Sequence, residues 1–202
     1  MNYFVTAIGT DSGKTLVSAI LVEALGADYW KPVQSGLPRD TETVQGLVST
    51  SVGRFYQEKY LLQTPASPHA SARIDGVTIR LEDFHPPVSN RDLIIEGAGG
   101  AMVPLNDDEV IIDLVPRLSA EVILVSNLYL GSINHTLLSI ALLKQRGYPV
   151  KGIIFNGEPN PESEQVILRK CDWPCLLRIK KHEIITPELV RQYAGELAKV
   201  FI

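Results

Sequence analysis

The feature that most constrains the fold is a glycine-containing loop between an apolar run and a helical run near the N-terminus. Residues 3–8 read YFVTAI, and the loop after them reads GTDSGKT. An apolar, β-rich run that ends in a glycine turn predicts a buried strand, and residues 13–26 carry apolar positions at helical spacing. A strand, a glycine loop and a helix in this order direct backbone N–H groups and the positive end of a helix into one concavity, which is typical of phosphate binding.

The glycine spacing of this loop differs from the usual pattern, which is glycine, four residues, then Gly-Lys-Ser or Gly-Lys-Thr. Here Gly13, Lys14 and Thr15 are present, but Ile8 stands where the first glycine is expected and Gly9 follows it. The strand before the loop and the helix after it still favour nucleotide binding, with Lys14 on the β- and γ-phosphates and the Thr15 hydroxyl on Mg²⁺. The alternative is a helix-capping turn that happens to contain Gly-Lys-Thr.

Further runs rich in Ile and Val predict more strands, each ending in a polar or glycine-containing loop. The predicted strands are residues 28–33, 92–97, 121–127 and 151–156, with helices between them that include residues 132–146 and 187–201. Strands without polar alternation are typical of a parallel sheet that is covered on both faces. We therefore expect one α/β domain, residues 1–202, with a doubly wound, mostly parallel sheet flanked by helices. In such folds ligands bind beyond the carboxyl ends of the strands.

The composition limits the classes of partner. The chain has 202 residues and a formal net charge of −4, with 45% hydrophobic and 21% charged residues. Nucleic-acid-binding surfaces gather Lys and Arg, so a negative net charge argues against this function. No apolar run approaches the ~20 residues of a membrane span, and the N-terminus shows no secretory signal. We expect a cytoplasmic protein that binds neither nucleic acid nor membrane.

Two cysteines and a histidine allow a metal site as an alternative. Cys171, Cys175 and His182 match no common zinc spacing and supply only three ligands. We favour two reduced thiols in a cytosolic protein.

Three ionisable residues follow the predicted strands. Lys31 ends the second strand, where a buried ammonium needs an anion; alternatively, its stem lies along apolar surface and its charge reaches water. Asp40 either joins a site or caps the helix after it. Glu96 ends the strand of residues 92–97 and precedes Ala98-Gly99-Gly100, as does a Mg²⁺-binding carboxylate of nucleotide triphosphatases. The alternative for Glu96 is an exposed side chain in a glycine-rich turn.

Six segments together resemble one known family. In chain order they are FVTAIGTDSGKT, KPVQSG, SPHAS, IIEGAGG, LGSINHT and FN, and they extend over nearly the whole chain. On these motifs the chain resembles the dethiobiotin synthetases of the biotin pathway, which have a fold of P-loop NTPase type and a lengthened phosphate loop. Ala7 departs from the family's common first glycine, and Asp11 stands where a glutamate is common.

The resemblance implies an ATP-dependent cyclo-ligase that requires Mg²⁺. It would convert 7,8-diaminopelargonate, CO₂ and ATP to dethiobiotin, ADP and phosphate. One amine takes up CO₂ to form a carbamate, and the carbamate attacks the γ-phosphate to give a carbamic-phosphoric anhydride. The second amine then closes the ring and expels phosphate. The resemblance also implies a homodimer with the active site at its interface.

The resemblance assigns roles to individual residues of this chain. It makes Lys31 and Lys14 catalytic, and Thr15, Asp40 and Glu96 the ligands of Mg²⁺. The implied nucleotide contacts are Asp11, Ser12, Gly13, Lys14, Thr15, Leu16, Asp40, Glu96, Asn156, Arg178 and Ile179. The implied substrate contacts are Ser35, Ser67, Gly97, Ala98, Gly99 and Gly100, with Leu130, Gly131 and Asn134 reaching the far carboxylate across the dimer interface.

Two of these assignments keep an alternative. The segment LLRIKK departs from the family's usual IP pattern, which leaves the base specificity open, and Arg178, Lys180 and Lys181 either contact phosphates or are solvated. The segment LGSINHT either binds a carboxylate at a helix N-terminus or is an ordinary helix start with Ser132 or Asn134 near its cap.

The main competing interpretation is a nucleotide-driven switch related to septum-positioning and plasmid-partition ATPases. Those proteins usually carry an additional lysine early in the phosphate loop, and residues 7–12 of this chain contain none. An amphipathic membrane-targeting tail is also lacking. An amidotransferase-linked synthetase of cobalamin type normally includes a glutaminase domain, for which we expect no room in 202 residues.

Overall fold

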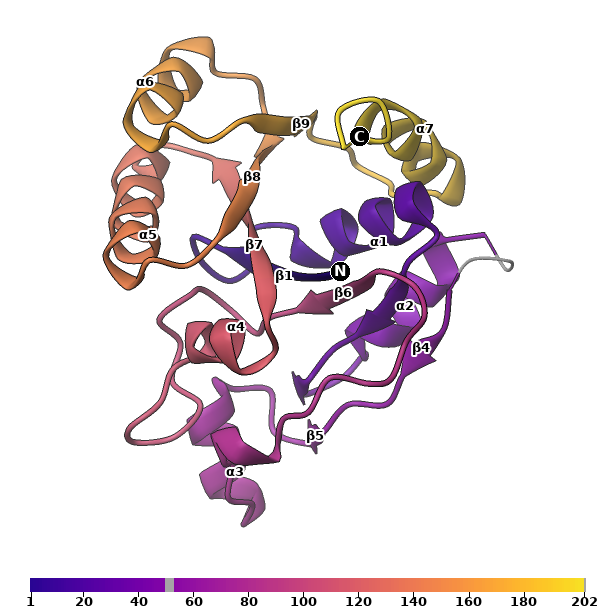
Figure 1. Ribbon diagram of the computed structural model, residues 1–202, viewed down its shortest axis with the longest axis vertical. Coiled ribbons are helices and arrows are strands. Elements are labelled where there is room, and N and C mark those ends of the chain that lie inside the picture. The colour runs from indigo at the N-terminus through magenta and orange to yellow at the C-terminus, as the bar shows by residue number, and fades with distance from the viewer. Residues whose placement is uncertain (50–52, 202) are drawn as a thin grey trace.

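Seven parallel strands form the central sheet of the computed structural model, which describes residues 1–49 and 53–201 (Figure 1). In order across the sheet they are β4 (Phe55–Tyr56), β2 (Asp28–Trp30), β6 (Leu93–Glu96), β1 (Asn2–Ala7), β7 (Ala120–Leu128), β8 (Val150–Gly157) and β9 (Cys175–Ile179). A separate sheet pairs β3 (Val33–Ser35) with β5 (Tyr60–Leu62), also in parallel. The prediction of an α/β domain with a mostly parallel sheet flanked by helices is confirmed.

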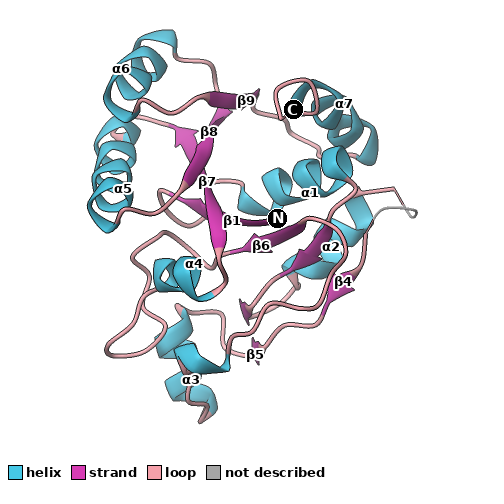
Figure 2. Cartoon of the chain, viewed as in Figure 1, coloured by secondary structure: helices cyan, strands magenta, loops and turns pink. Residues whose placement is uncertain are grey.

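Helices cover both faces of the central sheet (Figure 2). One face carries α1 (Lys14–Leu25), α2 (Asp40–Leu47) and α7 (Pro187–Leu197), and the other carries α4 (Leu114–Arg117), α5 (Ser132–Arg146) and α6 (Pro161–Cys171). Helix α3 (Pro68–Asp75) lies against the small sheet. None of the described helices combines the length and the apolar character needed to cross a membrane.

The apolar core consists of two layers, one on each side of the sheet. Tyr3 and Val5 of β1 pack with the residues of α1 and α7, whereas Phe4 between them packs on the side of α5 and α6. Both neighbours of β1 repeat this pattern, so the central strands are buried on both faces. This double burial explains why the sequences of these strands show apolar runs without polar alternation.

Four of the five predicted strands and all three predicted helices are present within a few residues of their expected ends. The prediction of one strand over residues 28–33 is wrong, because β2 ends at Trp30 and β3 begins at Val33 in the other sheet. Pro32 lies between them and has no N–H to donate to a strand ladder. Its carbonyl oxygen instead accepts hydrogen bonds from the backbone of Lys59 and Tyr60. Lys31 therefore lies just beyond the end of β2, at the edge of the sheet where α1 begins.

We expect Gly152→Ala to lower the free energy of unfolding by about 1–3 kcal/mol, because added atoms in a packed core force backbone shifts. A Cβ at Gly152 of β8 would lie 2.6 Å from Leu176 Cγ and 2.6 Å from the carbonyl oxygen of Pro174. Thermal unfolding followed by circular dichroism checks the result. Gly195→Ala in α7 is the matched control, because its Cβ meets nothing within 4 Å. The free energy of unfolding of that variant should rise by about 0.5–1 kcal/mol, because alanine has a better helix propensity than glycine. An equal decrease in the stability of both variants would contradict the packing argument.

Candidate active site

The loop between β1 and α1 is tied to the ends of two neighbouring strands. The hydroxyl of Ser12 donates to the Oδ1 atom of Asn127 at 2.8 Å, and the amide Nδ2 of Asn156 donates to the carbonyl oxygen of Ser12 at 2.9 Å. Gly13 is the N-cap of α1 and has φ = 92°, a left-handed conformation that favours glycine. Residues far apart in the sequence therefore hold the loop at the N-terminus of α1, where anions bind.

Lys14 lies at the base of a cavity beside this loop. Its side chain is largely buried, and its Nζ atom donates to the carbonyl oxygen of Gly9 at 3.3 Å. Burial, together with the positive charge of Lys31, lowers the pKa of Lys14 to about 8. Lys14 is thus a cation held in the cavity, and among the described residues its one hydrogen-bond partner is a carbonyl oxygen, which suits it to bind an anion.

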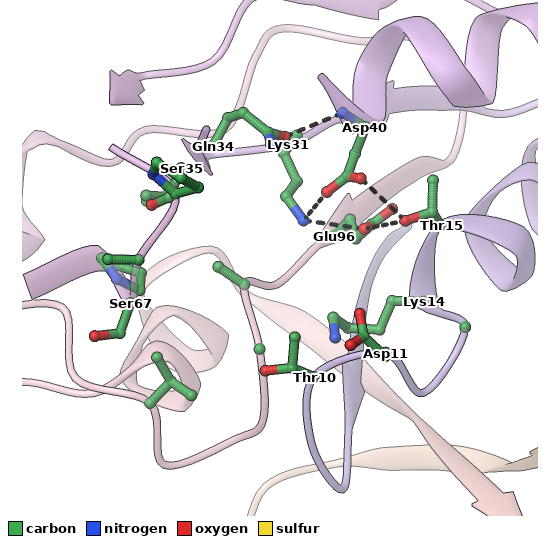
Figure 3. Close-up of a pocket in the computed structure, with 18 residues that line it drawn as sticks. Thr10, Asp11, Lys14, Thr15, Lys31, Gln34, Ser35, Asp40, Ser67 and Glu96 are labelled. Atoms are coloured by element: carbon green, nitrogen blue, oxygen red, sulfur yellow. Dashed lines mark hydrogen bonds and ion pairs between the residues drawn. The ribbon is translucent and has the colours of Figure 1, made fainter. Parts of the chain in front are cut away.

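Lys31 lies between two carboxylates at the edge of the sheet (Figure 3). Its Nζ atom lies 2.7 Å from Asp40 Oδ2 and 3.0 Å from Glu96 Oε1, and it also donates to the carbonyl oxygen of Gly97 at 3.0 Å. The side chain is 4% exposed, so the alternative in which its charge reaches water is wrong. The two carboxylates raise the pKa of Lys31 against the opposing effect of burial, which keeps the ammonium charged.

The hydroxyl of Thr15 meets the same two carboxylates. Its Oγ1 atom lies 3.2 Å from Asp40 Oδ1 and 3.2 Å from Glu96 Oε1. Glu96 is almost fully buried, so its interpretation as an exposed turn residue is wrong. Asp40 is the first residue of α2 and makes no side-chain cap; its carboxylate points to Lys31 and Thr15 (Figure 3).

These three side chains fit a magnesium ion. One hydroxyl and two carboxylates are oxygen donors of the kind that Mg²⁺ binds, usually with waters and phosphate oxygens completing its shell. The ammonium of Lys31 already lies between the two carboxylates, which shows that they accept a cation there. In the part of the chain that the structure describes, no cluster of three or more His, Cys, Asp or Glu side chains could hold a metal. The alternative metal ligand His182 instead pairs with the hydroxyl of Tyr193 at 2.9 Å.

A cavity of about 710 Å³ brings most of the predicted site residues together. The predicted residues that line it are Asp11, Gly13, Lys14, Thr15, Lys31, Ser35, Asp40, Ser67, Glu96, Ala98 and Gly99. The Oγ atom of Ser35 is buried and has no hydrogen-bond partner among the described residues, and Ser67 Oγ lies 3.1 Å from His69 Nδ1. The cavity size is in the range of small-molecule sites.

Two predicted glycines lie behind the cavity wall. Gly97 packs against Phe4 and Ile111, and Gly100 packs against the backbone of Gly9. Gly97 contributes to the site through its carbonyl oxygen, which accepts from Lys31. Sequence reasoning missed Thr10 and Gln34, which also line the cavity. Both belong to the segments that predicted the site, but neither side chain carries a charge that could have singled it out.

A second hollow, of about 330 Å³, opens on the other side of the phosphate loop. Its lining includes the predicted residues Asp11, Leu16 and Asn156, together with Lys180, Lys181 and His182, which follow β9. Arg178 and Ile179, which are also predicted nucleotide contacts, do not line it. Since side chains alternate along a strand, Arg178 turns outward to pair with Glu164 at 2.6 Å, and Ile179 turns into the core.

The remaining predicted contacts lie at the start of α5. Leu130 and Asn134 are exposed, and Gly131 is the N-cap of the helix with φ = 101°. Within the described part of the chain no side chain caps this helix; Ser132 is buried and accepts from the backbone N–H of Tyr129 at 3.3 Å. None of Leu130, Gly131 and Asn134 lines the cavity of Figure 3.

The lowered pKa of Lys14 predicts a pH-dependent affinity for nucleotide. Lys14 is protonated below pH 8 and loses its charge as the pH rises through about 8. Bound phosphates favour the protonated form, so the affinity for ADP without metal should fall by up to roughly tenfold per pH unit above pH 8. Calorimetric titrations with ADP and EDTA between pH 7 and pH 9 measure this. The Lys14→Arg variant keeps its charge throughout this range, and an equal decline in that variant would contradict the prediction.

Comparisons with known proteins match the chain over most of its length. The profile of the AAA domain family matches residues 1–189. The chain is 55% identical over 197 residues to the ATP-dependent dethiobiotin synthetase BioD of Cytophaga hutchinsonii. The aligned residues make up 96% of each of the two chains. It is 48% identical over 200 residues to the enzyme of the same name from Christiangramia forsetii, which covers 98% of this chain and 96% of that one.

Solved structures with the same fold are more distant in sequence. One of them is the septum site-determining protein MinD of Pyrococcus horikoshii, solved with Mg-ADP. Its superposition covers 100% of this chain and 93% of the MinD chain, with a TM-score of 0.59 and a sequence identity of 18%. A ParA family ATPase from Chlorobium tepidum superposes over 99% and 95% with a TM-score of 0.57 and 14% identity. At these identities the likeness concerns the fold alone.

Proposed function

The chain belongs to the family of ATP-dependent dethiobiotin synthetases, and from this premise we propose that it closes the ureido ring of dethiobiotin from 7,8-diaminopelargonate, CO₂ and Mg·ATP. One observation carries the proposal: Lys14, Thr15, Lys31, Asp40 and Glu96 converge on one cavity at the carboxyl edge of the sheet. Phosphoryl transfer depends on positioning and on neutralising charge, and these side chains supply both.

In this proposal the phosphate loop and Lys14 bind the triphosphate, and Thr15, Asp40 and Glu96 hold Mg²⁺. A metal held by these residues would supply positive charge that neutralises the phosphates. Lys14 gives up its hydrogen bond to the carbonyl oxygen of Gly9 and turns its ammonium to the phosphates. Because Lys14 is largely buried, its charge acts in a medium of low dielectric constant, where it is more effective than in water.

Lys31 acts on the group that is transferred. Its charge compensates Asp40 and Glu96. Mg²⁺ held by Asp40 and Glu96 would compensate the same carboxylates, and the ammonium of Lys31 would then stabilise the carbamate and the transferring phosphoryl oxygens.

The reaction itself needs little covalent help from the protein. The lone pair of one substrate amine forms a bond to the carbon of CO₂ and the nitrogen loses a proton, which gives a carbamate. A carbamate oxygen then bonds to the γ-phosphorus as the bond to ADP breaks. The second amine attacks the carbonyl carbon of this carbamic-phosphoric anhydride, loses a proton and expels phosphate. Ser35, whose buried hydroxyl finds no partner among the described residues, and Ser67, which lines the same cavity, are suited to hold the diamine or its carbamate.

The second hollow is our proposed site for the nucleotide base. It adjoins the phosphate loop through Asp11 and Leu16, and the amide of Asn156 can donate to and accept from a purine edge. Lys180 and Lys181, rather than Arg178 and Ile179, are the residues of this region that line the hollow.

We further propose a cytoplasmic homodimer in which Leu130, Gly131 and Asn134 bind the far carboxylate of the partner's substrate. These residues are exposed and precede or open α5, whose positive N-terminal end favours a carboxylate. Both cysteines are free thiols, which suits a reducing compartment.

Incubation with Mg·ATP and bicarbonate, with and without 7,8-diaminopelargonate, tests the function. We expect a product with the mass of dethiobiotin, formed in equal amount to ADP, only when the diamine is present. ATP hydrolysis that ignores the diamine, without a cyclic urea product, would refute the proposal and favour a switch ATPase.

A further inference from the structure

We propose that Tyr29 is a positioning residue for the metal: its hydroxyl holds one oxygen of Glu96 in the core so that the other oxygen faces the cavity. The inference rests on the proposed function, because it gives Glu96 the role of a metal ligand. Tyr29 does not itself line the cavity, and acts only through the carboxylate of Glu96.

The hydrogen bonds of Glu96 divide its two oxygens between two environments. Tyr29 Oη donates to Glu96 Oε2 at 2.9 Å inside the core. Glu96 Oε1 lies 3.0 Å from Lys31 Nζ and 3.2 Å from Thr15 Oγ1, on the side of the cavity. This division fixes the rotation of the carboxylate, and it directs a single oxygen toward the place where the cation is bound.

The adjacent strands make this contact. Tyr29 of β2 is paired with Ile94 of β6, two residues before Glu96, so both side chains project from the same face of the sheet. The ring of Tyr29 is fully buried and packs against Phe55 with ring centroids 5.8 Å apart. Its hydroxyl is therefore held in place by packing, and little additional freedom is lost when it binds Glu96.

Packing alone does not explain the hydroxyl. A phenylalanine would fill the same space in the core, and the hydroxyl makes no other hydrogen bond within the described residues. A buried hydroxyl without a partner is costly, so its presence at this position is explained by Glu96. The carboxylate of Glu96 is only 1% exposed, so water can hardly reach it. If the hydroxyl of Tyr29 is removed, Glu96 Oε2 loses the one hydrogen-bond donor that the described residues give it. We expect Glu96 to rotate and its Oε1 atom to leave its present position.

The test compares metal binding by the parent protein and by Tyr29→Phe. Electron paramagnetic resonance measures the free Mn²⁺ that remains in the presence of saturating ADP. Because partners that orient a metal ligand typically contribute 10–100-fold in affinity, we expect Mn²⁺ to bind roughly tenfold more weakly to the variant. Binding of ADP in EDTA should not change, since within the described residues the hydroxyl of Tyr29 bonds to Glu96 and not to the phosphate loop.

The matched control is Tyr56→Phe on the neighbouring strand. Tyr56 also donates to a carboxylate, Asp28 Oδ2 at 3.0 Å, but neither residue lines the cavity. This control should lose stability without losing Mn²⁺ affinity, with both variants measured below their unfolding temperatures. The inference is overturned if Tyr29→Phe binds Mn²⁺ like the parent, if both variants weaken it equally, or if the parent does not bind Mn²⁺ with ADP. A parent that binds Mn²⁺ and ADP but forms no dethiobiotin would refute the proposed function and leave this inference standing.

Discussion

Replacing Lys31 with alanine is expected to lower the rate of dethiobiotin formation by about a thousandfold, the loss typical of removing a group that stabilises developing negative charge. The affinity for ADP should stay nearly unchanged, because Lys31 lies between Asp40 and Glu96 and not on the phosphate loop. Single-turnover measurements of product and calorimetric titrations with ADP separate the two effects. A variant that turned over at the parent rate would remove Lys31 from the mechanism.

The same change should also make stability depend on the metal. Without Lys31 the buried carboxylate of Glu96 loses the one ion pair that the described residues give it, and breaking a buried ion pair by removing one partner costs about 3–5 kcal/mol. Mg²⁺ between the carboxylates should recover part of this loss, so Mg²⁺ should raise the unfolding temperature of Lys31→Ala more than that of the parent. Lys144→Ala is the control, because Lys144 pairs with Asp172 at the surface, where such pairs contribute little.

Much of the fold could be predicted because the strands are buried on both faces. Their apolar runs and the glycines around α1 were enough to predict the parallel sheet and its first crossover. The break between β2 and β3 was missed although Pro32 marks it, because a short apolar run on both sides of a proline resembles one strand. Helix α6 was not predicted, although its N-cap Asn160 and its first residue Pro161 are typical of the start of a helix.

The charged residues of the site could be predicted because each lies at the end of a strand or the start of a helix. Parallel strands bring their carboxyl ends to one edge, so Lys31 and Glu96 meet there although 65 residues separate them. Tyr29 could not be found in this way, because in the sequence it is one more apolar position of a buried strand. The outward turn of Arg178 could not be known from the sequence, because strand β9 was not predicted and its register was therefore missing.

Replacing Gly13 with alanine is expected to weaken ADP binding by on the order of 100-fold. Gly13 has φ = 92°, and an alanine there is strained by about 1–2 kcal/mol. Its Cβ would also overlap Nδ2 of Asn156 and lie 3.2 Å from Cγ, so Asn156 must give up its hydrogen bond to Ser12 at about 1 kcal/mol. The loop of the variant relieves this strain by adopting conformations that do not bind ADP. The free energy needed to return to the binding conformation lowers the affinity for ADP. Calorimetric titration with ADP measures the loss.

Gly9→Ala separates this explanation from a general need for glycine in the loop. A Cβ at Gly9 meets nothing within 4 Å, so this variant should bind ADP within about twofold of the parent. If both variants lost affinity equally, the conformation of Gly13 would not be the cause. The expected difference also accounts for the unusual spacing of the motif. The glycine that the backbone requires is the one at the N-cap of α1, against the amide of Asn156, and the chain can therefore carry Ala7 and Ile8 where other phosphate loops have their first glycine.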